Sequence, residues 1–355
     1  LEGVLCDLEN IISGCVMKRL GIKRKEFGNY NIVLVVPDLF PRPHLKELVN
    51  LFLRNLQFKS MYMHLESVLA CFGTSVASAC VVDIGYEKTT ICCVDEGVVL
   101  PGTMVRKNFG SKHINDTLFY MLHSRKMFGY NKKNYSVDPN NEADMSQIDK
   151  LKEKGCYVKD IEDYSNRIYE VFAIREGKEE AIPVVHSELL TLPPHCLFTR
   201  AWNYLPQPIK TEFYDHRSPL FDLYEDKEDC FEEFSGGGDI FPALTESPHY
   251  NPQMTDPYVY CPLEDMICYS IANIKDADFR KKMANSILLV GGAAHSTGMV
   301  EVLEDRLIER INFYDNTIER VEIVDLVTRD IPPIQASWLG GSVLPKLDSL
   351  RDLWI

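Results

Sequence analysis

The sequence predicts a mixed α/β protein with two lobes, and three observations support this fold class. The chain has 355 residues, of which 45% are hydrophobic and 25% charged, so it has the composition of a globular protein and the length for a two-lobed body. Short continuous apolar runs at 32–36, 80–84 and 286–290 are typical of strands buried on both faces. Apolar residues at three- and four-residue steps follow the first and last of these runs and indicate amphipathic helices.

In the first 73 residues, prolines and a glycine separate helix patterns from strand patterns. Pro37-Asp38 closes the first apolar run, and Pro41 and Pro43 precede a helix, where proline is tolerated in the first turn. Gly73 ends the next helix. The elements predicted here are a helix within 1–28, strands at 32–36 and 60–63, and helices at 45–56 and 66–72.

Two apolar strands joined by a tight turn, at 80–85 and 89–94, predict a β-hairpin, and a further strand starts at Val98. The first strand ends in Asp83-Ile84-Gly85, which places a carboxylate beside flexible backbone. This arrangement suits a hydrated Mg²⁺ ion and a phosphate chain. An aspartate at a hairpin turn also serves as an ordinary turn residue, so the motif alone leaves both interpretations open.

The middle of the chain combines helices with two polar stretches. Helix patterns stand at 110–123 and 149–157, and the stretch 124–145, rich in Asn and Lys, is predicted as a surface loop. Lys152 and Glu153 in the second helix have the ordinary interpretation of solvated surface charges. Residues 218–256 combine an acidic run with a glycine cluster and several prolines, so we predict a lightly ordered surface insertion there.

Regular patterns return in the last hundred residues, around the strand at 286–290. Gly291-Gly292 follow this strand at once, and glycines allow the backbone to approach a bound group and to donate its N–H groups. A plain tight turn explains the pair equally well. The other predicted elements are helices at 262–273, at 276–285 and from 298, a strand at 321–324, and a Gly340-Gly341 turn that opens a C-terminal helix with Leu347, Leu350, Leu353 and Trp354 on its apolar side.

Charge and cysteine content narrow the classes of function. The net charge of −14 disfavours a broad nucleic-acid-binding surface and suits basic partners such as histone tails, although acidity also serves solubility alone. The 11 cysteines stand mostly in apolar runs without metal-ligand spacing, so we expect reduced core thiols. The sequence contains no run of 18 apolar residues, so no membrane-spanning helix is predicted. Because the chain starts at Leu1, we expect it to be a piece of a longer protein.

Three motifs occur in the order found in the actin-fold ATP-binding superfamily, which also includes sugar kinases and heat-shock chaperones. They are Asp83-x-Gly85 on a hairpin, Lys152-Glu153 on a helix, and Gly291-Gly292 between a strand and a helix. The segments 152–158, 286–299 and 337–344 resemble actin's adenine-clasping segment, its adenosine loop and its C-terminal glycine segment. On these residues the chain is identified as a member of the actin family.

The resemblance implies an actin-like fold, with two lobes around a nucleotide cleft and with ATP and Mg²⁺ as cofactors. It assigns 1–105 to the remainder of the first lobe with its phosphate-binding hairpin, 106–285 to the second lobe, and 286–355 to the adenosine loop and the return to the first lobe. Asp83 is the implied metal ligand. The implied nucleotide-binding residues are Asp83, Gly85, Lys88, Thr89, Lys152, Glu153, Gly291, Gly292 and Ala293.

Within the family, the segments 64–68, 80–89 and 92–94 and the acidic insertion resemble a nuclear branch that does not form filaments. This resemblance implies a scaffold subunit of an INO-type chromatin-remodelling complex, located in the nucleus. The implied partners are actin and another actin-related protein, a long helix of the remodelling ATPase, and histones and linker DNA reached through the complex. No membrane partner is implied.

The chain departs from the family pattern at the phosphate end. The resemblance begins after the family's first phosphate loop, so the N-terminal part of the first lobe has no counterpart in these residues. Glu66 stands where actin has the glutamine that positions the attacking water, and Thr90 where actin has a histidine. Next to Asp83, a glutamate would repel a terminal phosphate, although a glutamate at a helix start is equally explained by the helix dipole.

These departures predict that ATP is held tightly as a structural ligand with weak or no hydrolysis, so no catalytic residue is assigned. One alternative is a filament-forming relative of conventional actin, which the insertion at 218–256 disfavours. The other is a sugar-kinase-type phosphotransferase with Asp83 as general base, which the lack of a sugar-contacting motif disfavours.

Overall fold

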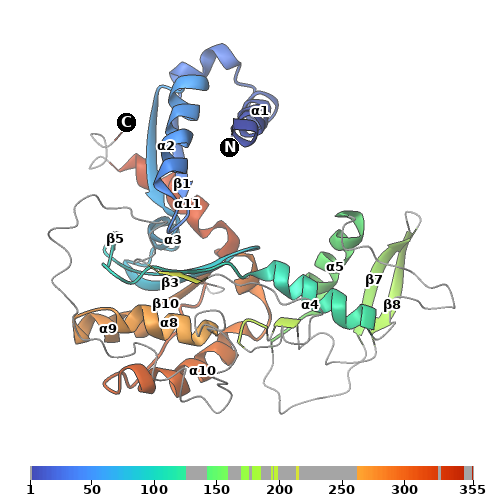
Figure 1. Cartoon of the computed structure of the whole chain (residues 1–355), viewed down its shortest axis with the longest axis vertical. Helices are drawn as coiled ribbons and strands as arrows, with labels where there is room; N and C mark the ends of the chain where they lie inside the picture. Colours follow the sequence, from blue (N-terminus) through green and yellow to red (C-terminus); the bar gives the residue numbers. More distant parts are fainter. Residues whose placement is uncertain are drawn as a thin grey trace.

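The structure is a computed structural model, and its central feature is a mixed β-sheet (Figure 1). The described residues are 2–124, 142–158, 169–175, 178–184, 193–194, 196–198, 213–215, 262–326, 329–347 and 354. The insertion predicted at 218–256 and most of the loop predicted at 124–145 lie outside these ranges. The described residues confirm the predicted mixture of helices and strands.

The central sheet joins segments that are far apart in the sequence. Its strands are β3 (Ser78–Ile84), β4 (Thr89–Asp95), β5 (Val98–Val99), β6 (Val105–Lys107), β9 (Phe213–Asp215) and β10 (Ile287–Val290). Their order is β10-β3-β4-β6-β9, with β5 beside β4. The pair β10–β3 is parallel, and the other pairs are antiparallel. The sheet thus takes strands from all three predicted segments, 1–105, 106–285 and 286–355, whose boundaries stay a prediction.

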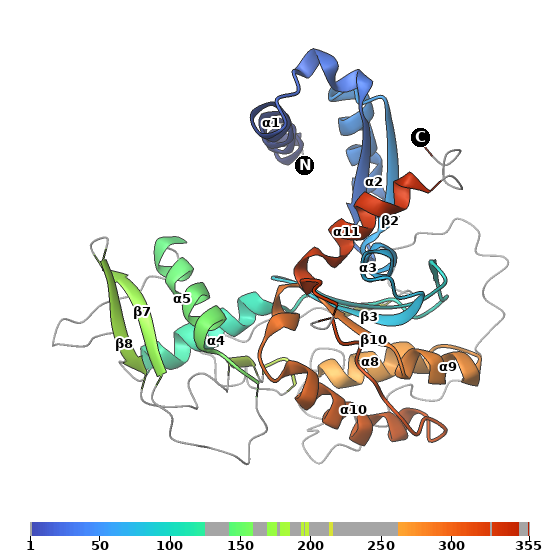
Figure 2. The ribbon, with the colours of Figure 1, turned by 180° about the vertical axis from the view of Figure 1, so that it is seen from behind.

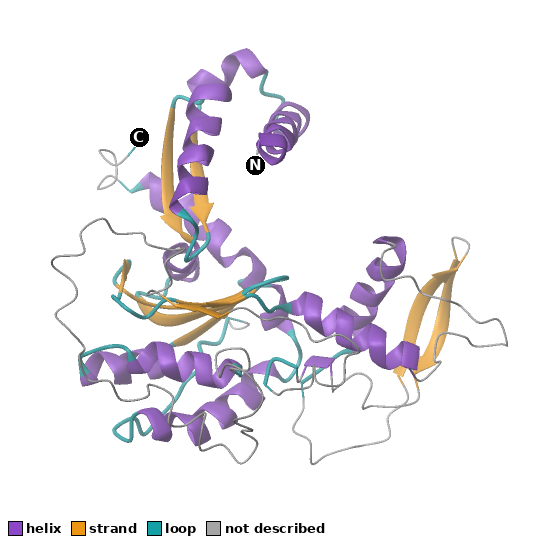
Figure 3. Cartoon of the chain, in the orientation of Figure 1, coloured by secondary structure: helices purple, strands orange, loops and turns teal. Residues whose placement is uncertain are grey.

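Helices cover both faces of this sheet, which explains the continuous apolar runs in its strands. In the view of Figures 1 and 3, α8 (Leu263–Ala272), α9 (Ala277–Ala284) and α10 (Met299–Tyr314) lie below the sheet, and α3 (Glu66–Thr74) and α11 (Ala336–Val343) lie above it. Alternate residues of β3 enter two separate cores: Cys80 and Val82 pack with α8, and Ala79 and Val81 pack with α3. Both faces are therefore apolar, as expected of a doubly covered sheet.

A smaller unit stands on top of the central sheet and carries the N-terminus (Figure 2). It contains α1 (Glu2–Arg19), a 3₁₀ helix (Arg24–Asn29), β1 (Asn31–Val36), α2 (Arg42–Asn50), a π-helical turn (Leu51–Asn55) and β2 (Ser60–Leu65). β1 and β2 form a parallel pair, so β1, α2 and β2 make one βαβ crossover. The core of this unit consists of Phe27, Leu51, Phe52, Leu56, Phe58 and Met61.

A third unit extends sideways from the sheet (Figure 1). It contains α4 (Ser111–Ser124), α5 (Glu142–Gly155) and the hairpin of β7 (Tyr169–Arg175) and β8 (Lys178–Val184). α4 packs against α5 through Leu118, Ile148 and Leu151. The helix predicted at 149–157 is thus present but begins earlier than its apolar pattern indicated.

The helices α3 and α11 cross closely because a glycine lies on each side of the contact. A Cβ atom at Gly73 would lie 2.0 Å from the carbonyl oxygen of Ala336, and one at Gly340 would lie 1.8 Å from that of Leu69. The prediction that Gly340-Gly341 form a turn opening a helix is therefore wrong, because both glycines lie inside α11, where they allow close packing. Of the later apolar positions, Leu350 and Leu353 lie outside the described residues. Leu347 is exposed, and Trp354 lies beside the ring of Tyr62.

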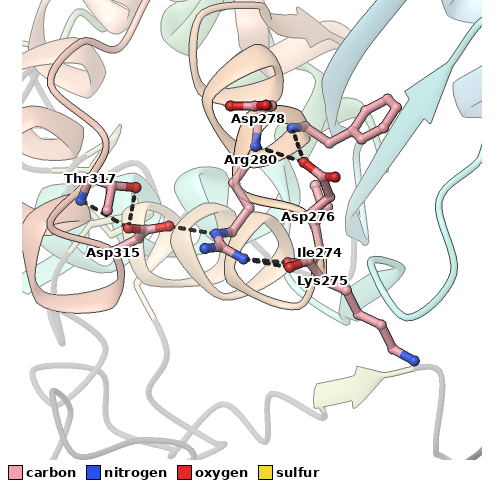
Figure 4. Close-up of polar contacts among 8 residues, drawn as sticks. Ile274, Lys275, Asp276, Asp278, Arg280, Asp315 and Thr317 are labelled. Atoms are coloured by element: carbon pink, nitrogen blue, oxygen red, sulfur yellow. Dashed lines mark hydrogen bonds and ion pairs between the residues drawn. The ribbon is translucent and has the colours of Figure 1, made fainter.

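Arg280 joins the ends of α8, α9 and α10 (Figure 4). Its guanidinium donates to the carboxylate of Asp315 and to the carbonyl oxygens of Ile274 (2.8 Å) and Lys275 (3.1 Å). The side chain of Asp276 caps the start of α9. Since these bonds satisfy backbone groups at helix ends, the cluster holds the lower helix layer together.

The segment 321–324, predicted as a strand, forms only one isolated bridge, between Ile287 and Ile323. The carboxylate of Glu304 accepts the N–H of Ile323 at 2.9 Å, so a side chain takes the place of a second strand there. Most of the described cysteines are buried, as predicted for core thiols: Cys71, Cys80, Cys92, Cys93, Cys196 and Cys268. Cys156 is only partly buried, and Cys6 and Cys15 are exposed on α1. Among the described helices, none is long and apolar enough to cross a membrane.

Replacing Gly340 with alanine is expected to lower the free energy of unfolding by about 2 kcal/mol or more, because the added Cβ forces α3 and α11 apart. Gly3→Ala is the control, since a Cβ there meets nothing within 4 Å. At this exposed position of α1 the substitution should leave the free energy of unfolding unchanged or raise it by up to about 1 kcal/mol. Urea unfolding measures the free energy of unfolding of both variants. An equal loss of stability in the two would contradict the close crossing of α3 and α11.

Candidate functional site

A cavity of about 830 Å³ lies between the central sheet and the unit of α4 and α5. Its volume falls within the ~300–1,000 Å³ typical of small-molecule sites. The cavity is lined by Glu66, Asp83, Gly85, Tyr86, Ser111, Ile114, Asp149, Lys152, Glu153, Cys156, Gly291, Gly292, Ala293, His295, Ser296, Thr297, Pro333, Ile334 and Ser337. These residues come from six separate stretches of the sequence, so only the folded chain assembles the site.

One wall of the cavity is made by the neighbouring ends of β3 and β10. These strands are parallel, with Asp83 opposite Val290, so the segments that follow the two strands leave the sheet at the same edge. Gly291 has a φ of +92°, and a Cβ there would lie 2.4 Å from the carboxylate oxygen Oδ1 of Asp83. Only glycine allows this approach. The glycine pair predicted to receive a bound group therefore lies directly beside the predicted metal ligand.

The turn between β3 and β4 is bonded to the start of α4. The N–H of Gly85 donates to the carbonyl of Lys88 at 2.9 Å and closes the turn. The carbonyl oxygens of Gly85 and Tyr86 then accept the N–H groups of Ser111 (3.0 Å) and Lys112 (2.8 Å). These bonds satisfy the first free N–H groups of α4 and fix this helix relative to Asp83.

The segment after β10 is bonded to the end of α5. The N–H of Val158 donates to the carbonyl of Thr297 at 2.8 Å, and Tyr157 forms a bridge with Thr297. Gly298 has a φ of +78°, and a Cβ there would lie 2.0 Å from the carbonyl oxygen of Val158. Because of this contact, the helix that carries Lys152 and the glycine segment form one continuous wall of the cavity.

Lys152 reaches across the cavity toward the turn of β3 and β4. Its Nζ lies 3.0 Å from a carboxylate oxygen of Asp149 and 5.9 Å from the ring centre of Tyr86. An ammonium over a tyrosine ring is a cation–π contact. The side chain of Lys152 thus connects the α4–α5 unit to the turn that carries Gly85.

The cavity has an acidic end, where Glu66 and Asp83 face one cation. Lys88 forms an ion pair with Oε1 of Glu66, the first residue of α3. The same oxygen accepts the N–H of Asp38 (3.2 Å) and the hydroxyl of Thr90 (3.3 Å). The hydroxyl of Ser67 in turn donates to the carboxylate of Asp38 at 2.9 Å.

Burial raises the pKa of both aspartates at this end. The pKa of Asp83 is raised to about 6, mainly by burial and then by the charge of Glu66, while Lys88 opposes the shift. The pKa of the fully buried Asp38 is raised to about 8 by burial and by Glu66. Asp38 is therefore mostly protonated at neutral pH.

The structure brings most of the predicted site residues together. Glu66, Asp83, Gly85, Lys152, Glu153, Gly291, Gly292 and Ala293 all line the cavity. Two predicted nucleotide contacts lie elsewhere. The Nζ of Lys88 is directed to Glu66, and Thr89 is buried, with its hydroxyl donating to the carbonyl of Phe109 at 2.7 Å.

Sequence reasoning missed several residues of the site. Tyr86 belongs to the predicted turn, and Asp149 to the predicted helix, but nothing in the sequence placed them opposite each other. Ile334 is 65% exposed at the edge of the cavity and comes from a segment without a strong pattern. Asp38 had a usable signal, because it ends its strand run as Asp83 does.

The described residues contain no group of three or more His, Cys, Asp or Glu side chains that could hold a metal ion. This does not conflict with Asp83 as a Mg²⁺ ligand, because Mg²⁺ in nucleotide sites is commonly held by one or two carboxylates with waters and substrate phosphates. Asp83 is placed for that role beside the glycine backbone of Gly291.

A family model described as Actin matches residues 3–355, so the chain belongs to the actin family. This membership confirms the actin-like fold predicted from the sequence. The chain is similar to actin-related protein 8 of Bos taurus, with 27% identity over 414 residues that cover 100% of this chain and 65% of the relative. It is also similar to actin-related protein 9 of Arabidopsis thaliana, with 29% identity over 356 residues that cover 98% and 56% respectively.

Among solved structures, the chain is similar to the human actin-related protein Arp8 in its ATP-bound state. The TM-score is 0.76 and the identity 27%, over 99% of this chain and 62% of the human one. The branch of the family that the sequence resembled is that of actin-related protein 8, and these similarities confirm it. The chain spans between 56% and 65% of the length of these relatives.

Gly291→Ala is expected to destabilise the protein by about 2 kcal/mol, because the new Cβ meets the Asp83 carboxylate and the backbone must keep a positive φ. The neighbouring variant Gly292→Ala provides the control, since its Cβ would meet only Ile334, at 3.8 Å. Thermal and urea unfolding distinguish the two. A loss of similar size at both positions would contradict the contact with Asp83.

Asp38→Asn should remove a pH dependence of stability. The folded pKa of about 8 lies above the ordinary value of 3.8, so the contribution of Asp38 to wild-type stability is fully present below about pH 4 and is lost as the pH rises through 8. In urea unfolding, the free energy of unfolding of Asp38→Asn relative to that of the wild type should therefore rise by about 2 kcal/mol or more between pH 5 and pH 9. Asp95→Asn is the control of opposite sign, because Lys282 and Ser78 lower the pKa of Asp95.

Proposed function

We propose that this chain is the nucleotide-binding core of a nuclear actin-related protein that forms no filaments and holds ATP with weak or no hydrolysis. The observation that carries the proposal is the convergence of Asp83, the Gly291-Gly292 pair and the Lys152-Glu153 pair on one cavity. Membership in the actin family and the similarity to a human relative solved in its ATP-bound state support it.

The residues of the cavity fit a nucleotide with Mg²⁺. Gly85, Gly291 and Gly292 line the cavity with backbone that carries no side chain, which phosphate oxygens could approach, and Asp83 would hold the metal ion. Lys152 and Glu153 on α5 would contact the nucleoside, and the apolar side chain of Ile334 offers a surface for a base. Bound Mg·ATP would supply charge and contacts that join the β3–β4 turn to α5, and so stabilise the folded form by mass action.

We further propose that the whole protein is a scaffold subunit of an INO-type chromatin-remodelling complex in the nucleus. Its partners would be actin, another actin-related protein, a helix of the remodelling ATPase, and histones with linker DNA. The similarity to actin-related protein 8 supports this role. The net charge of −14 suits basic partners such as histone tails.

The two alternative functions make different predictions for the full-length protein. A filament-forming relative would sediment at high protein concentration with Mg²⁺, whereas the proposed scaffold stays in the supernatant. A sugar-kinase-type phosphotransferase would consume ATP faster when sugars are added, whereas the proposed scaffold would not.

The nucleotide content of the purified full-length protein tests the proposal. After denaturation, chromatography of the supernatant should show about one ATP per chain. Asp83→Asn should lower this content at least about tenfold, because the metal ligand is lost. Asp95→Asn, at the opposite end of the same hairpin and outside the cavity, should retain ATP. A wild type that carries no nucleotide, and takes up none from Mg·ATP, would rule the proposal out.

A further inference from the structure

The outer end of the N-terminal unit is basic, although the chain as a whole is acidic. This end lies at the top of Figure 1, away from the central sheet, and is built by the residues between α1 and β1 and those between α2 and β2. The stretches 18–30 and 54–59 contain seven Lys and Arg residues and one acidic residue, Glu26, whereas the whole chain has 38 basic and 52 acidic residues. Charge is thus distributed unevenly over the molecule.

Hydrogen bonds hold the two stretches together, so their cations belong to one surface. The guanidinium of Arg24 forms an ion pair with Glu9 of α1 at 2.8 Å and donates to the carbonyl of Asn55 at 2.7 Å. The N–H of Lys59 donates to the carbonyl of Tyr30 at 2.9 Å, next to the start of the parallel pair of β1 and β2. Arg24 therefore has a structural role and joins α1 to the second stretch.

The other six cations have no acidic partner among the described residues. The one acid of the two stretches, Glu26, accepts the N–H of Lys23 at 3.1 Å and closes the start of the 3₁₀ helix. The basic end consists of six exposed side chains that form no ion pair with the described part of the chain: Lys18, Arg19, Lys23, Lys25, Arg54 and Lys59.

Helix stability explains only part of this charge. Lys18 and Arg19 stand in the last turn of α1, where the helix dipole favours cations. Lys23, Lys25 and Lys59 lie outside α1, so the dipole of that helix does not account for them. Like charges on one surface repel each other, and an anionic partner removes this repulsion.

The aromatic side chains of the basic end argue against single-stranded nucleic acid as that partner. Proteins bind single strands by stacking the bases on exposed aromatic rings. Phe27 and Phe58 are buried and stack on each other, with ring centres 4.9 Å apart. Of the aromatic residues in the two stretches, only Tyr30 is exposed. The phosphates of a duplex need no such rings.

The packing of α1 argues against a membrane surface. A helix that binds a membrane inserts its apolar face at the boundary of the lipid headgroups. The apolar face of α1 is instead packed on the core of the N-terminal unit, through Leu5, Leu8, Ile12 and Val16. The cations of the basic end thus stand on a surface that is suited to a polar, charged partner.

We propose that the basic end binds the phosphate backbone of duplex DNA without preference for base sequence. Lys and Arg, together with Asn, Gln and Tyr side chains, make many of the protein contacts to phosphates, and these contacts carry no sequence information directly. Asn29, Tyr30 and Gln57 are exposed among the cations. The inference rests on the proposed role beside linker DNA and adds the surface that makes the contact. None of its residues lines the cavity.

A triple variant of the full-length protein, Lys23→Gln, Lys25→Gln and Lys59→Gln, tests the proposal. Fluorescence anisotropy of a labelled duplex of about 30 base pairs measures its affinity between about 50 and 200 mM KCl. We expect binding at least about tenfold weaker than that of the wild type. The slope of log K against log salt concentration should become shallower by about 3, because three phosphate contacts are lost.

Two further variants separate contact with phosphates from other effects of the substitutions. Replacement of the same positions as Lys23→Arg, Lys25→Arg and Lys59→Arg keeps the charge and should restore affinity to within about threefold of the wild type. Three lysines before and on α9, in the lower helix layer, supply the control of equal net charge: Lys275→Gln, Lys281→Gln and Lys282→Gln. This control should bind DNA within about twofold of the wild type.

Nucleotide content and circular dichroism accompany each binding measurement. All variants should carry the ATP content of the wild type and its circular dichroism spectrum, because the substituted side chains are exposed and lie outside the cavity. A wild type that binds DNA but retains no ATP would overturn the proposed nucleotide binding and leave the basic end standing.

Three outcomes would overturn the inference. The first is wild-type affinity and salt dependence in the Lys→Gln variant of the basic end, which would leave the proposed nucleotide binding intact. The second is an equal loss of DNA binding in the α9 control, since net charge alone would then explain the effect. The third is binding to anionic phospholipid vesicles or to polyglutamate that is as tight as binding to the duplex, which would assign the basic end to another class of partner.

Discussion

The parallel pairing of β3 with β10 is the interaction on which the rest of the structure depends. It brings residues near 80 beside residues near 290 and aligns Asp83 with Val290, so that Asp83 and Gly291 meet at one edge of the sheet. The same pairing divides the interior into two cores, because alternate residues of both strands pack against opposite helix layers. A site at the carboxyl ends of neighbouring parallel strands is the common consequence of such a sheet.

Close glycine contacts fix the walls around that edge. A Cβ at Gly110 would lie 2.4 Å from the carbonyl oxygen of Gly85, so α4 begins in contact with the β3–β4 turn. Gly298 in the same way holds the end of α5 against the glycine segment, and Gly340 holds α11 against α3. Each contact joins stretches that are distant in sequence. The cavity is therefore a product of the packing of the whole chain.

The charges in the cavity are divided between its two sides. On the side of α5, Lys152 faces Tyr86 and Asp149, which leaves a cation next to an open, partly apolar space. At the other end, burial keeps Asp38 neutral, and Lys88 is paired with Glu66. The departures from the actin pattern, Glu66 and Thr90, lie at this second end and contact each other.

The sequence by itself determined the α/β class, the strands at 32–36, 80–84 and 286–290, and the motifs Asp83-x-Gly85 and Gly291-Gly292, because apolar runs and short glycine or carboxylate motifs are local signals. The cavity residues Glu66, Lys152, Glu153 and Ala293 were predicted only through the resemblance to the actin family. Sequence reasoning misjudged Gly340-Gly341, because the close approach of α3 to Gly340 comes from Leu69, which is distant in the sequence. Only the tertiary structure decided that Lys88 pairs with Glu66, that Thr89 is buried, and that Tyr86 faces Lys152. Such partners depend on the spatial arrangement of separate elements, which no local pattern records.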